Sequence, residues 1–191
     1  MFKKTLRKII LFGKFKMNNI ISHSFDISLK TKIGKNSSIM KNCEIDAFSI
    51  IGNYNYIGNN CFITKANIGN YCSIANNVSI GPGEHNLSKI STNSIFYNEE
   101  YEALTKLNCT IKNDVWIGVD SVILRGVTIG NGVIIGANSV VNKDIPDFAI
   151  AVGSPAKVIK YRFKKNKINK ILKSKWWESD IDYARKLMKD L

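Results

Sequence analysis

Isoleucine occupies every sixth position of the stretch Asn113-Asp-Val-Trp-Ile-Gly-Val-Asp-Ser-Val-Ile-Leu-Arg-Gly-Val-Thr-Ile-Gly130. The same spacing fills an earlier block of the chain, where a single five-residue step separates Ile63 from Ile68. Fourteen of the fifteen positions are isoleucine and the last is valine: Ile33, Ile39, Ile45, Ile51, Ile57, Ile63, Ile68, Ile74, Ile80, Ile111, Ile117, Ile123, Ile129, Ile135 and Val141. A fixed period of this kind indicates a repeat architecture.

A period of six residues fits neither the two-residue alternation of an ordinary strand nor the 3.6-residue turn of a helix. It fits a short strand followed by a corner, and three such units close a triangular coil of about 18 residues. Glycine often follows the isoleucine, as at Gly118 and Gly130, because it accepts the backbone angles of a corner. Four positions after the isoleucine the residue is mostly small, as at Cys61 and Ser121. The sequence therefore predicts an all-β fold, a parallel β-helix whose stacked coils bury a column of isoleucine.

The repeat is interrupted once, between Ile80 and Ile111. We expect an excursion loop over residues 86–110, and loops of this length in a compact domain are usually functional or disordered. The chain contains only two histidines, His23 and His85. His85 ends the sequence Gly-Pro-Gly-Glu-His at the start of the interruption, whereas His23 precedes the repeat and is expected at the surface.

The net charge of +13 belongs to the two ends of the chain. Residues 1–17 hold six basic residues and no acidic ones, and residues 157–175 hold nine basic residues and no acidic ones. Residues 18–156 hold 10 basic and 11 acidic residues. A nucleic-acid-binding protein places its basic residues on a folded face, so we do not expect a nucleic-acid partner. Charged ends suit an anionic cofactor, a membrane surface or solubility.

The 191 residues fit one domain with short appendages. We expect a basic amphipathic segment over 1–22, the β-helix over 23–156 and a basic extension with a helix over 157–191. In residues 2–16 the apolar side chains gather on one helical face, which either packs against the body or lies on an anionic membrane. The pair Trp176-Trp177 in the extension is expected to cap the open end of the solenoid.

The cellular compartment is predicted from what the sequence lacks. The four cysteines do not have the spacing of a zinc site, so we predict no metal and interpret them as buried free thiols. No secretory signal is evident, and no apolar run approaches the roughly 20 residues that span a bilayer. We therefore predict a cytoplasmic protein, with peripheral contact at the inner membrane face through residues 2–16 as an open alternative.

The repeat [Ile/Val]-Gly-x-x-[small]-x and the closing segment Gly153-Ser-Pro-Ala-Lys157 resemble the hexapeptide-repeat acyltransferases. The region from Gly81 to Phe96 and the tryptophan pair are similar to the branch of that family that acetylates xenobiotics and polysaccharides. The resemblance covers roughly residues 30–180. It implies a left-handed prism, acetyl-CoA as the acyl donor and a homotrimer.

The resemblance also implies a role for His85 as general base. Imidazole takes up a proton near neutral pH, and the family transfers the acetyl group directly in a ternary complex. The implied acceptor is a hydroxyl (or amine) of a sugar or surface-polysaccharide precursor. The family's usual proline before Phe96 is replaced by Ser94-Ile95, which leaves the identity of the acceptor open.

Six residues are implied for the coenzyme. Val119 and Ala137 lie 18 residues apart, so they stack on successive coils at one edge, where the pantetheine arm is expected. Four polar or basic residues are expected at the phosphates: Asn142, Lys143, Lys157 and Lys160. On the acceptor side the resemblance implies Asn55, and Trp116 either lines the site or fills a coil edge.

Two other functions stay open. An antibiotic acetyltransferase is similar in the histidine region and in the tryptophan pair. The alternative outside the enzymes is a noncatalytic β-helix with a binding or structural role. A purely structural ladder, however, would not be interrupted by a loop carrying a histidine.

Overall fold

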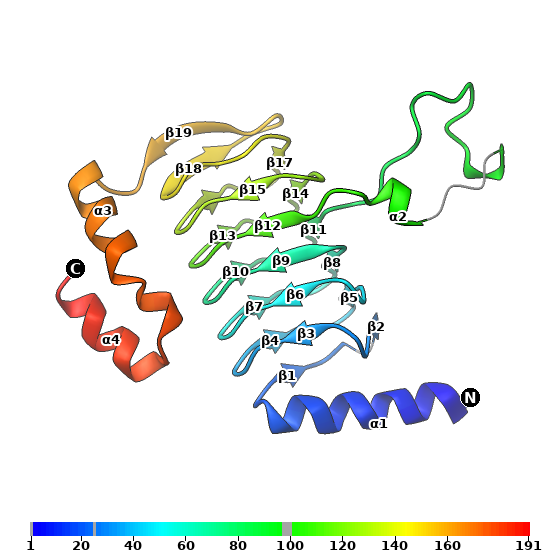
Figure 1. Cartoon of the computed structure of the whole chain (residues 1–191), viewed down its shortest axis with the longest axis horizontal. Helices are drawn as coiled ribbons and strands as arrows, with labels where there is room; N and C mark the ends of the chain where they lie inside the picture. Colours follow the sequence, from blue (N-terminus) through cyan, green and yellow to red (C-terminus); the bar gives the residue numbers. More distant parts are fainter. Residues whose placement is uncertain (1, 25, 97–100) are drawn as a thin grey trace.

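The computed structural model describes residues 2–24, 26–96 and 101–191 (Figure 1). Within that part of the chain, most strands contain only two residues, and they form three sheets of eight, six and five strands. Successive strands of the chain belong to different sheets, so the chain winds around three faces of a prism. Pairing is parallel except between the last two strands. The predicted parallel β-helix is confirmed.

The three sheets are the faces of the prism. The eight-stranded sheet contains β1 (Ile21–Ser22), β4 (Ser38–Ile39), β7 (Tyr56–Ile57), β10 (Ser73–Ile74), β13 (Trp116–Ile117), β16 (Ile134–Ile135), β18 (Ala149–Val152) and β19 (Lys157–Tyr161). The six-stranded sheet contains β2 (Asp26–Ile27), β5 (Glu44–Ile45), β8 (Phe62–Ile63), β11 (Ser79–Ile80), β14 (Val122–Ile123) and β17 (Val140–Val141). The five-stranded sheet contains β3 (Lys32–Ile33), β6 (Ile50–Ile51), β9 (Ala66–Ile68), β12 (Cys109–Ile111) and β15 (Thr128–Ile129).

The isoleucine of each strand points into the prism, and its neighbour in the strand points outward. All fifteen ladder positions are buried, and Ile39, Ile57 and Ile74 stack in register in one face with no exposed surface. The five-residue step before Ile68 is absorbed by β9, which pairs with Ile51 of β6. Burial of one large branched side chain per face and coil supplies the apolar surface that stabilises the solenoid.

The first coil begins before the isoleucine ladder. β1 pairs with β4 and aligns Ser22 with Ile39, so a serine occupies the inward position. Ile27 of β2 is fully buried, although it lies before the first predicted repeat position, Ile33. The predicted ladder therefore starts one position too late at Ile33, because Ile27 keeps the six-residue period and only the position before it, Ser22, is polar.

Helix α1 (Phe2–Met17) lies across the N-terminal end of the prism (Figure 1). Leu11 and Phe15 are buried against the first coil, and the ammonium of Lys14 donates to the carbonyl oxygen of Thr31 at 2.7 Å. Packing against the body, one of the two predicted alternatives, is therefore observed. Ile9 and Ile10 remain exposed. No helix in the described ranges has the length and apolarity that crossing a bilayer requires.

The excursion loop joins β11 to β12 and projects away from the prism (Figure 1). It covers residues 81–108 and not the predicted 86–110, because β11 ends at Ile80 and strand pairing resumes at Cys109. Its described residues include the 3-10 turn η1 (Ser94–Phe96) and the short helix α2 (Tyr101–Leu104). Large apolar side chains stand exposed on it, among them Leu87, Ile90 and Phe96.

The C-terminal extension contains α3 (Lys165–Ser174), η2 (Trp176–Glu178) and α4 (Ile181–Lys189) and lies along the flank of the prism opposite the loop (Figure 1). The prediction that Trp176 and Trp177 cap the open end is wrong. Both are buried beside Tyr71, whose hydroxyl donates to the carbonyl oxygen of Ser179 at 2.7 Å, and the Asn70 amide donates to the carbonyl oxygen of Trp177. The end of the eight-stranded sheet is covered instead by β19, antiparallel to β18.

Candidate functional site

His85 lies at the corner of the prism where the excursion loop leaves the six-stranded sheet. Its side chain is exposed, and the loop beside it is cross-linked by a hydrogen bond from the Glu84 amide to the carbonyl oxygen of Leu104, at 3.1 Å. His23 is also exposed, between β1 and β2 in the first coil. The two histidines therefore lie on different coils, and only His85 stands on a segment that departs from the repeat.

Val119 and Ala137 lie together at a different corner, between the eight-stranded and six-stranded sheets. The Asn138 amide donates to the carbonyl oxygen of Val119 at 2.9 Å, which stacks the two turns directly. A Cβ atom added to Gly118 would lie 2.6 Å from the Ala137 nitrogen, so this close stacking requires glycine. Both side chains are exposed, and together they form a smooth ridge along the corner.

The ridge continues toward the C-terminal end of the prism. A Cβ atom on Gly136 would lie 2.6 Å from Cγ1 of Val152, and Val152 pairs with Lys157 across β18 and β19. Lys157 therefore lies at the end of the ridge. Its side chain is exposed, so its ammonium group is available to an anion.

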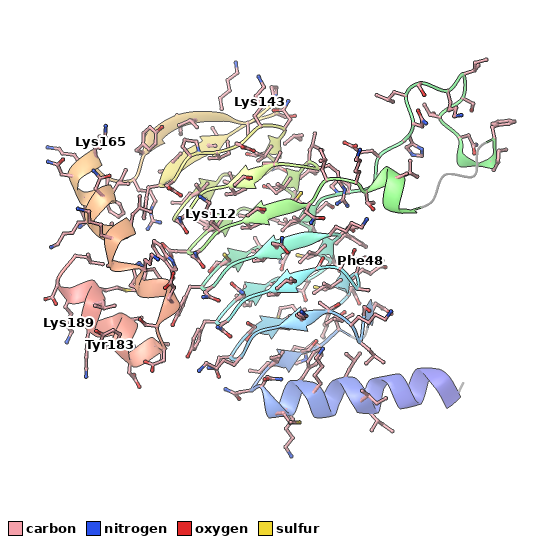
Figure 2. The ribbon with its side chains drawn as sticks, viewed as in Figure 1. Phe48, Lys112, Lys143, Lys165, Tyr183 and Lys189 are labelled. Atoms are coloured by element: carbon pink, nitrogen blue, oxygen red, sulfur yellow. The ribbon has the colours of Figure 1, made fainter. Side chains whose placement is uncertain are left out.

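Asn142, Lys143 and Lys160 surround the same end of the molecule. Asn142 and Lys143 directly follow β17 and are exposed, and Lys160 pairs with Ile150 in β18. Figure 2 shows Lys143 beside the last coils. All four residues predicted for the phosphates lie at the C-terminal end of the prism, but Asn142 and Lys143 follow β17 at the corner between the six-stranded and five-stranded sheets, which is the corner of His85 and not that of the ridge.

Within one chain His85 and the ridge of Val119 and Ala137 are not brought together. His85 stands at the corner between the six-stranded and five-stranded sheets, whereas Val119 and Ala137 form the corner between the eight-stranded and six-stranded sheets. The six-stranded face separates them. A site that uses both groups therefore requires a second chain.

Asn55 is a structural residue in this fold. It is 2% exposed, and its amide nitrogen donates to the carbonyl oxygen of Gly69 at 2.8 Å. Its amide oxygen accepts from the Cys72 nitrogen at 2.7 Å. The side chain thus substitutes for main-chain pairing between coils, and its position inside the prism does not match the acceptor-binding role that the sequence predicted.

Trp116 is 54% exposed on the eight-stranded face and lines a pocket of about 390 Å3. The pocket is formed by Tyr71, Ser73, Asp114, Val115, Trp116, Ile134 and Arg162. Arg162 donates to the Asp114 carboxylate at 3.2 Å. Burial raises the pKa of the Asp114 carboxyl above its ordinary value, and the Arg162 guanidinium opposes that shift. Ser73, Trp116 and Ile134 are register partners on stacked coils, whereas Arg162 reaches the pocket from the C-terminal extension, which no local sequence pattern connects to it.

Arg125 is a second residue to which the sequence assigned no role. It lies in the turn after β14, is 7% exposed, and its guanidinium donates to main-chain carbonyl oxygens at both ends of the excursion loop. In the sequence Arg125 is a charged residue at a repeat corner, directly before Gly126. A charged residue at such a corner is ordinarily interpreted as a solvated side chain, so its buried position was not predicted.

The family description "Bacterial transferase hexapeptide (six repeats)" matches residues 30–65 and 108–143. A chloramphenicol acetyltransferase from Klebsiella aerogenes is 34% identical over 66% of this chain, and the chain spans 65% of that protein's length. A probable macrolide acetyltransferase from Lysinibacillus sphaericus is 38% identical over 65% of this chain and 72% of its own length.

Among solved structures, a variant of AntD resembles this chain with a TM-score of 0.52 and 27% identity, over 86% of this chain and 96% of AntD. AntD is an N-acyltransferase from Bacillus cereus, in complex with dTDP-4-amino-4,6-dideoxyglucose and Coenzyme A. The family match falls on the same coils that the isoleucine ladder builds. The chain belongs to the hexapeptide-repeat transferases, whose prism is a left-handed β-helix.

Proposed function

We propose that this protein is an acetyl-CoA-dependent acetyltransferase that modifies a hydroxyl or amine of a sugar, with His85 as the general base. One observation carries the proposal: the repeat is broken only by a loop that presents an exposed histidine, in a family whose similar members are named acetyltransferases. A β-helix that served only as a scaffold would need no such loop.

His85 would act on the acceptor. As the acceptor oxygen or nitrogen attacks the thioester carbonyl carbon, the imidazole takes its proton, the carbon–sulfur bond breaks and the coenzyme leaves as a thiolate that regains a proton. No covalent enzyme intermediate is required. The exposure of His85 supports this role because the acceptor must approach the ring directly.

The ridge of Val119 and Ala137 suits the pantetheine arm. Small and apolar side chains on two stacked turns let a long flexible chain lie close to the main chain. Lys157 stands at the end of this ridge, and Lys160 follows it on the same strand, β19. Asn142 and Lys143 lie at the corner of the excursion loop, on the side of the chain that carries His85. Basic groups at the C-terminal end of the prism suit the phosphates of the coenzyme.

The catalytic site would form between two chains of a homotrimer. Because His85 and the ridge occupy different corners, one chain supplies the histidine and its neighbour supplies the ridge. The exposed apolar residues of the loop, Leu87, Ile90 and Phe96, suit burial against that neighbour.

A nucleotide-linked sugar is the favoured acceptor. AntD, whose fold this chain resembles over 96% of the AntD chain, holds a dTDP-amino sugar together with Coenzyme A. The second candidate is an antibiotic, which the chloramphenicol and macrolide acetyltransferase relatives favour. The names of these relatives point to different acceptors, so the choice between a sugar and an antibiotic requires a direct assay.

The experiment combines acetyl-CoA with a panel of nucleotide sugars, nucleotide amino sugars, simple sugars, chloramphenicol and a macrolide, and follows thiol release. We expect turnover with a member of the sugar panel. His85→Ala should lower kcat by about 100- to 10,000-fold, the usual range for loss of a general base. His23→Ala is the matched control and should retain wild-type turnover, because His23 lies on a different coil.

Full turnover by His85→Ala would contradict the base assignment. Turnover with chloramphenicol or the macrolide and with no member of the sugar panel would favour the second candidate, an antibiotic acetyltransferase. Absence of turnover together with absence of acetyl-CoA binding by calorimetry would favour the noncatalytic β-helix.

A further inference from the structure

Arg125 is a buried cation at the base of the excursion loop. Only 7% of it is exposed, although arginine is almost never buried without compensating partners. It lies in the turn between β14 and β15, at the same corner from which the loop leaves one coil earlier.

The Arg125 guanidinium connects the two ends of the loop. Its Nε donates to the carbonyl oxygen of Pro82 at 3.2 Å, and its Nη2 donates to that of Gly81. Its Nη1 donates to the carbonyl oxygen of Leu107 at 2.9 Å. A planar guanidinium can bond three carbonyls in fixed directions, whereas a lysine ammonium is a point charge on a flexible stem.

Two glycines shape the space around this group. Gly81 has a φ of +64°, and an added Cβ atom would lie 2.5 Å from the carbonyl oxygen of Thr64 and 3.3 Å from Cζ of Arg125. Gly126 has a φ of +73°, and an added Cβ atom would lie 2.9 Å from Cδ1 of Leu107. Both ends of the loop therefore approach the corner closely, and the guanidinium fills the space between them.

The contacts lead directly to His85. Pro82, which accepts from Arg125, precedes His85 by three residues, and Glu84 is bonded through its amide to Leu104 on the returning arm. The main chain from Gly81 to Glu84 is thus held at both ends. His85, which carries the imidazole, is the next residue after this held segment.

We propose that Arg125 is a positioning residue that fixes the start and end of the excursion loop and thereby holds His85 where it meets the acceptor. Arg125 acts through the main chain and does not touch a substrate. The catalytic part rests on the proposed function, whereas the holding of the loop does not depend on any activity.

The test uses the full chain and its two histidines. Labelled histidine gives two ring signals, His85 as the reporter and His23 as an internal control on another coil. In Arg125→Lys and Arg125→Leu the His85 signal should shift or broaden, while the His23 signal stays in place. Arg185→Leu is the matched arginine control, because Arg185 is exposed on α4, and it should change neither signal.

Kinetics test the catalytic part. We expect Arg125→Lys to lower kcat by about 10- to 100-fold, as small misplacements of a catalytic group do. The KM for acetyl-CoA should change less than kcat, because Val119, Ala137 and Lys157 lie at another corner. Of the residues proposed for the coenzyme, only Asn142 and Lys143 share the corner of Arg125. Added guanidinium should restore part of the kcat of Arg125→Gly, with potassium chloride at equal ionic strength as control. A residue that served only global stability would not give this split between kcat and KM.

An unchanged His85 signal in folded Arg125→Leu would overturn the proposal. If the variants do not fold, the wild type decides: the Arg125 Nε–H must exchange slowly with solvent, and fast exchange overturns the clamp. Failure of the proposed function looks different. In that case wild-type turnover is absent, while the histidine signals still report whether Arg125 holds the loop.

Discussion

Ile50 and Ile51 are adjacent in β6 but face opposite sides of the sheet. Ile51 is 1% exposed inside the prism, and Ile50 is 45% exposed on the outer face. We expect Ile51→Ala to lower the free energy of unfolding by about 2–5 kcal/mol, because it removes apolar contacts and leaves a cavity in the column. Ile50→Ala, the matched control, should change it by about 0.5 kcal/mol or less. Urea titration of both variants measures the difference, and equal losses would contradict the assignment of the column.

At the scale of single residues, the sequence predicted positions that repeat and missed those that do not. The buried isoleucines and small corner residues could be predicted because each coil imposes the same space. Asn55 was assigned to an acceptor, whereas its amide replaces main-chain bonds inside the prism. Arg125 received no role, because its partners Gly81 and Leu107 lie far from it in sequence and meet it only in the folded corner.

Tyr71 joins the C-terminal extension to the prism. It stacks on Tyr54 with ring centroids 4.6 Å apart, contacts Trp176, and its hydroxyl donates to the carbonyl oxygen of Ser179. We expect Tyr71→Phe to cost about 0.5–1.5 kcal/mol of stability, the net worth of one hydrogen bond. Limited proteolysis should cut α3 and α4 faster in this variant. Tyr183→Phe, exposed on α4, is the control (Figure 2).

The same tyrosine gives a pH dependence. Burial raises the pKa of Tyr71 from its ordinary value of 10 to about 12, with smaller contributions from Tyr54 and Asp180. The folded state therefore keeps a proton that the unfolded state loses, so Tyr71 contributes stability below pH 10 that is lost as the pH rises toward 12. Between these values the unfolding free energy should fall less in Tyr71→Phe than in the wild type. Denaturation curves measured at a series of pH values give both free energies. The same loss of unfolding free energy between pH 10 and pH 12 in Tyr71→Phe and in the wild type would contradict this prediction.

At the scale of elements, local pattern predicted one helix near each end of the chain but not where it lies, and it predicted neither α2 nor α4. A helix was expected within residues 157–191, and α3 lies there. Its position along the flank depends on Tyr71 and Asn70, about a hundred residues earlier, which no local pattern connects to it. Residues 2–16 were predicted as amphipathic with Ile9 and Ile10 on the apolar face, but α1 exposes these two and packs Leu11 and Phe15 against the body instead. Peripheral membrane contact through residues 2–16 stays a prediction.

The whole molecule should function only as an assembly, because His85 and the ridge occupy different corners of each chain. Co-expression of His85→Ala with Ala137→Trp tests this. Each variant alone should have little activity, since one lacks the base and the other blocks the ridge. Randomly mixed trimers should recover about a quarter of wild-type sites, those that pair an intact histidine with an intact ridge. Light scattering of the purified mixture should give the mass of three chains.

Two copies of His85→Ala carrying different tags provide the control and should recover nothing. Activity of the mixture no greater than that of the separate variants would place the site within one chain or away from this ridge.

The covered ends of the prism also determine how large this protein can become. A stack of parallel coils can in principle grow without limit, because the last coil exposes the same unpaired main-chain N–H and C=O groups on which it is itself stacked. Here α1 lies against β1 of the first coil and β19 reverses direction against β18, so neither end of the eight-stranded sheet offers a parallel template. These two elements keep a fold that is capable of fibre growth as a discrete particle. The number of stacked coils in a particle is therefore fixed by the sequence and does not grow with protein concentration.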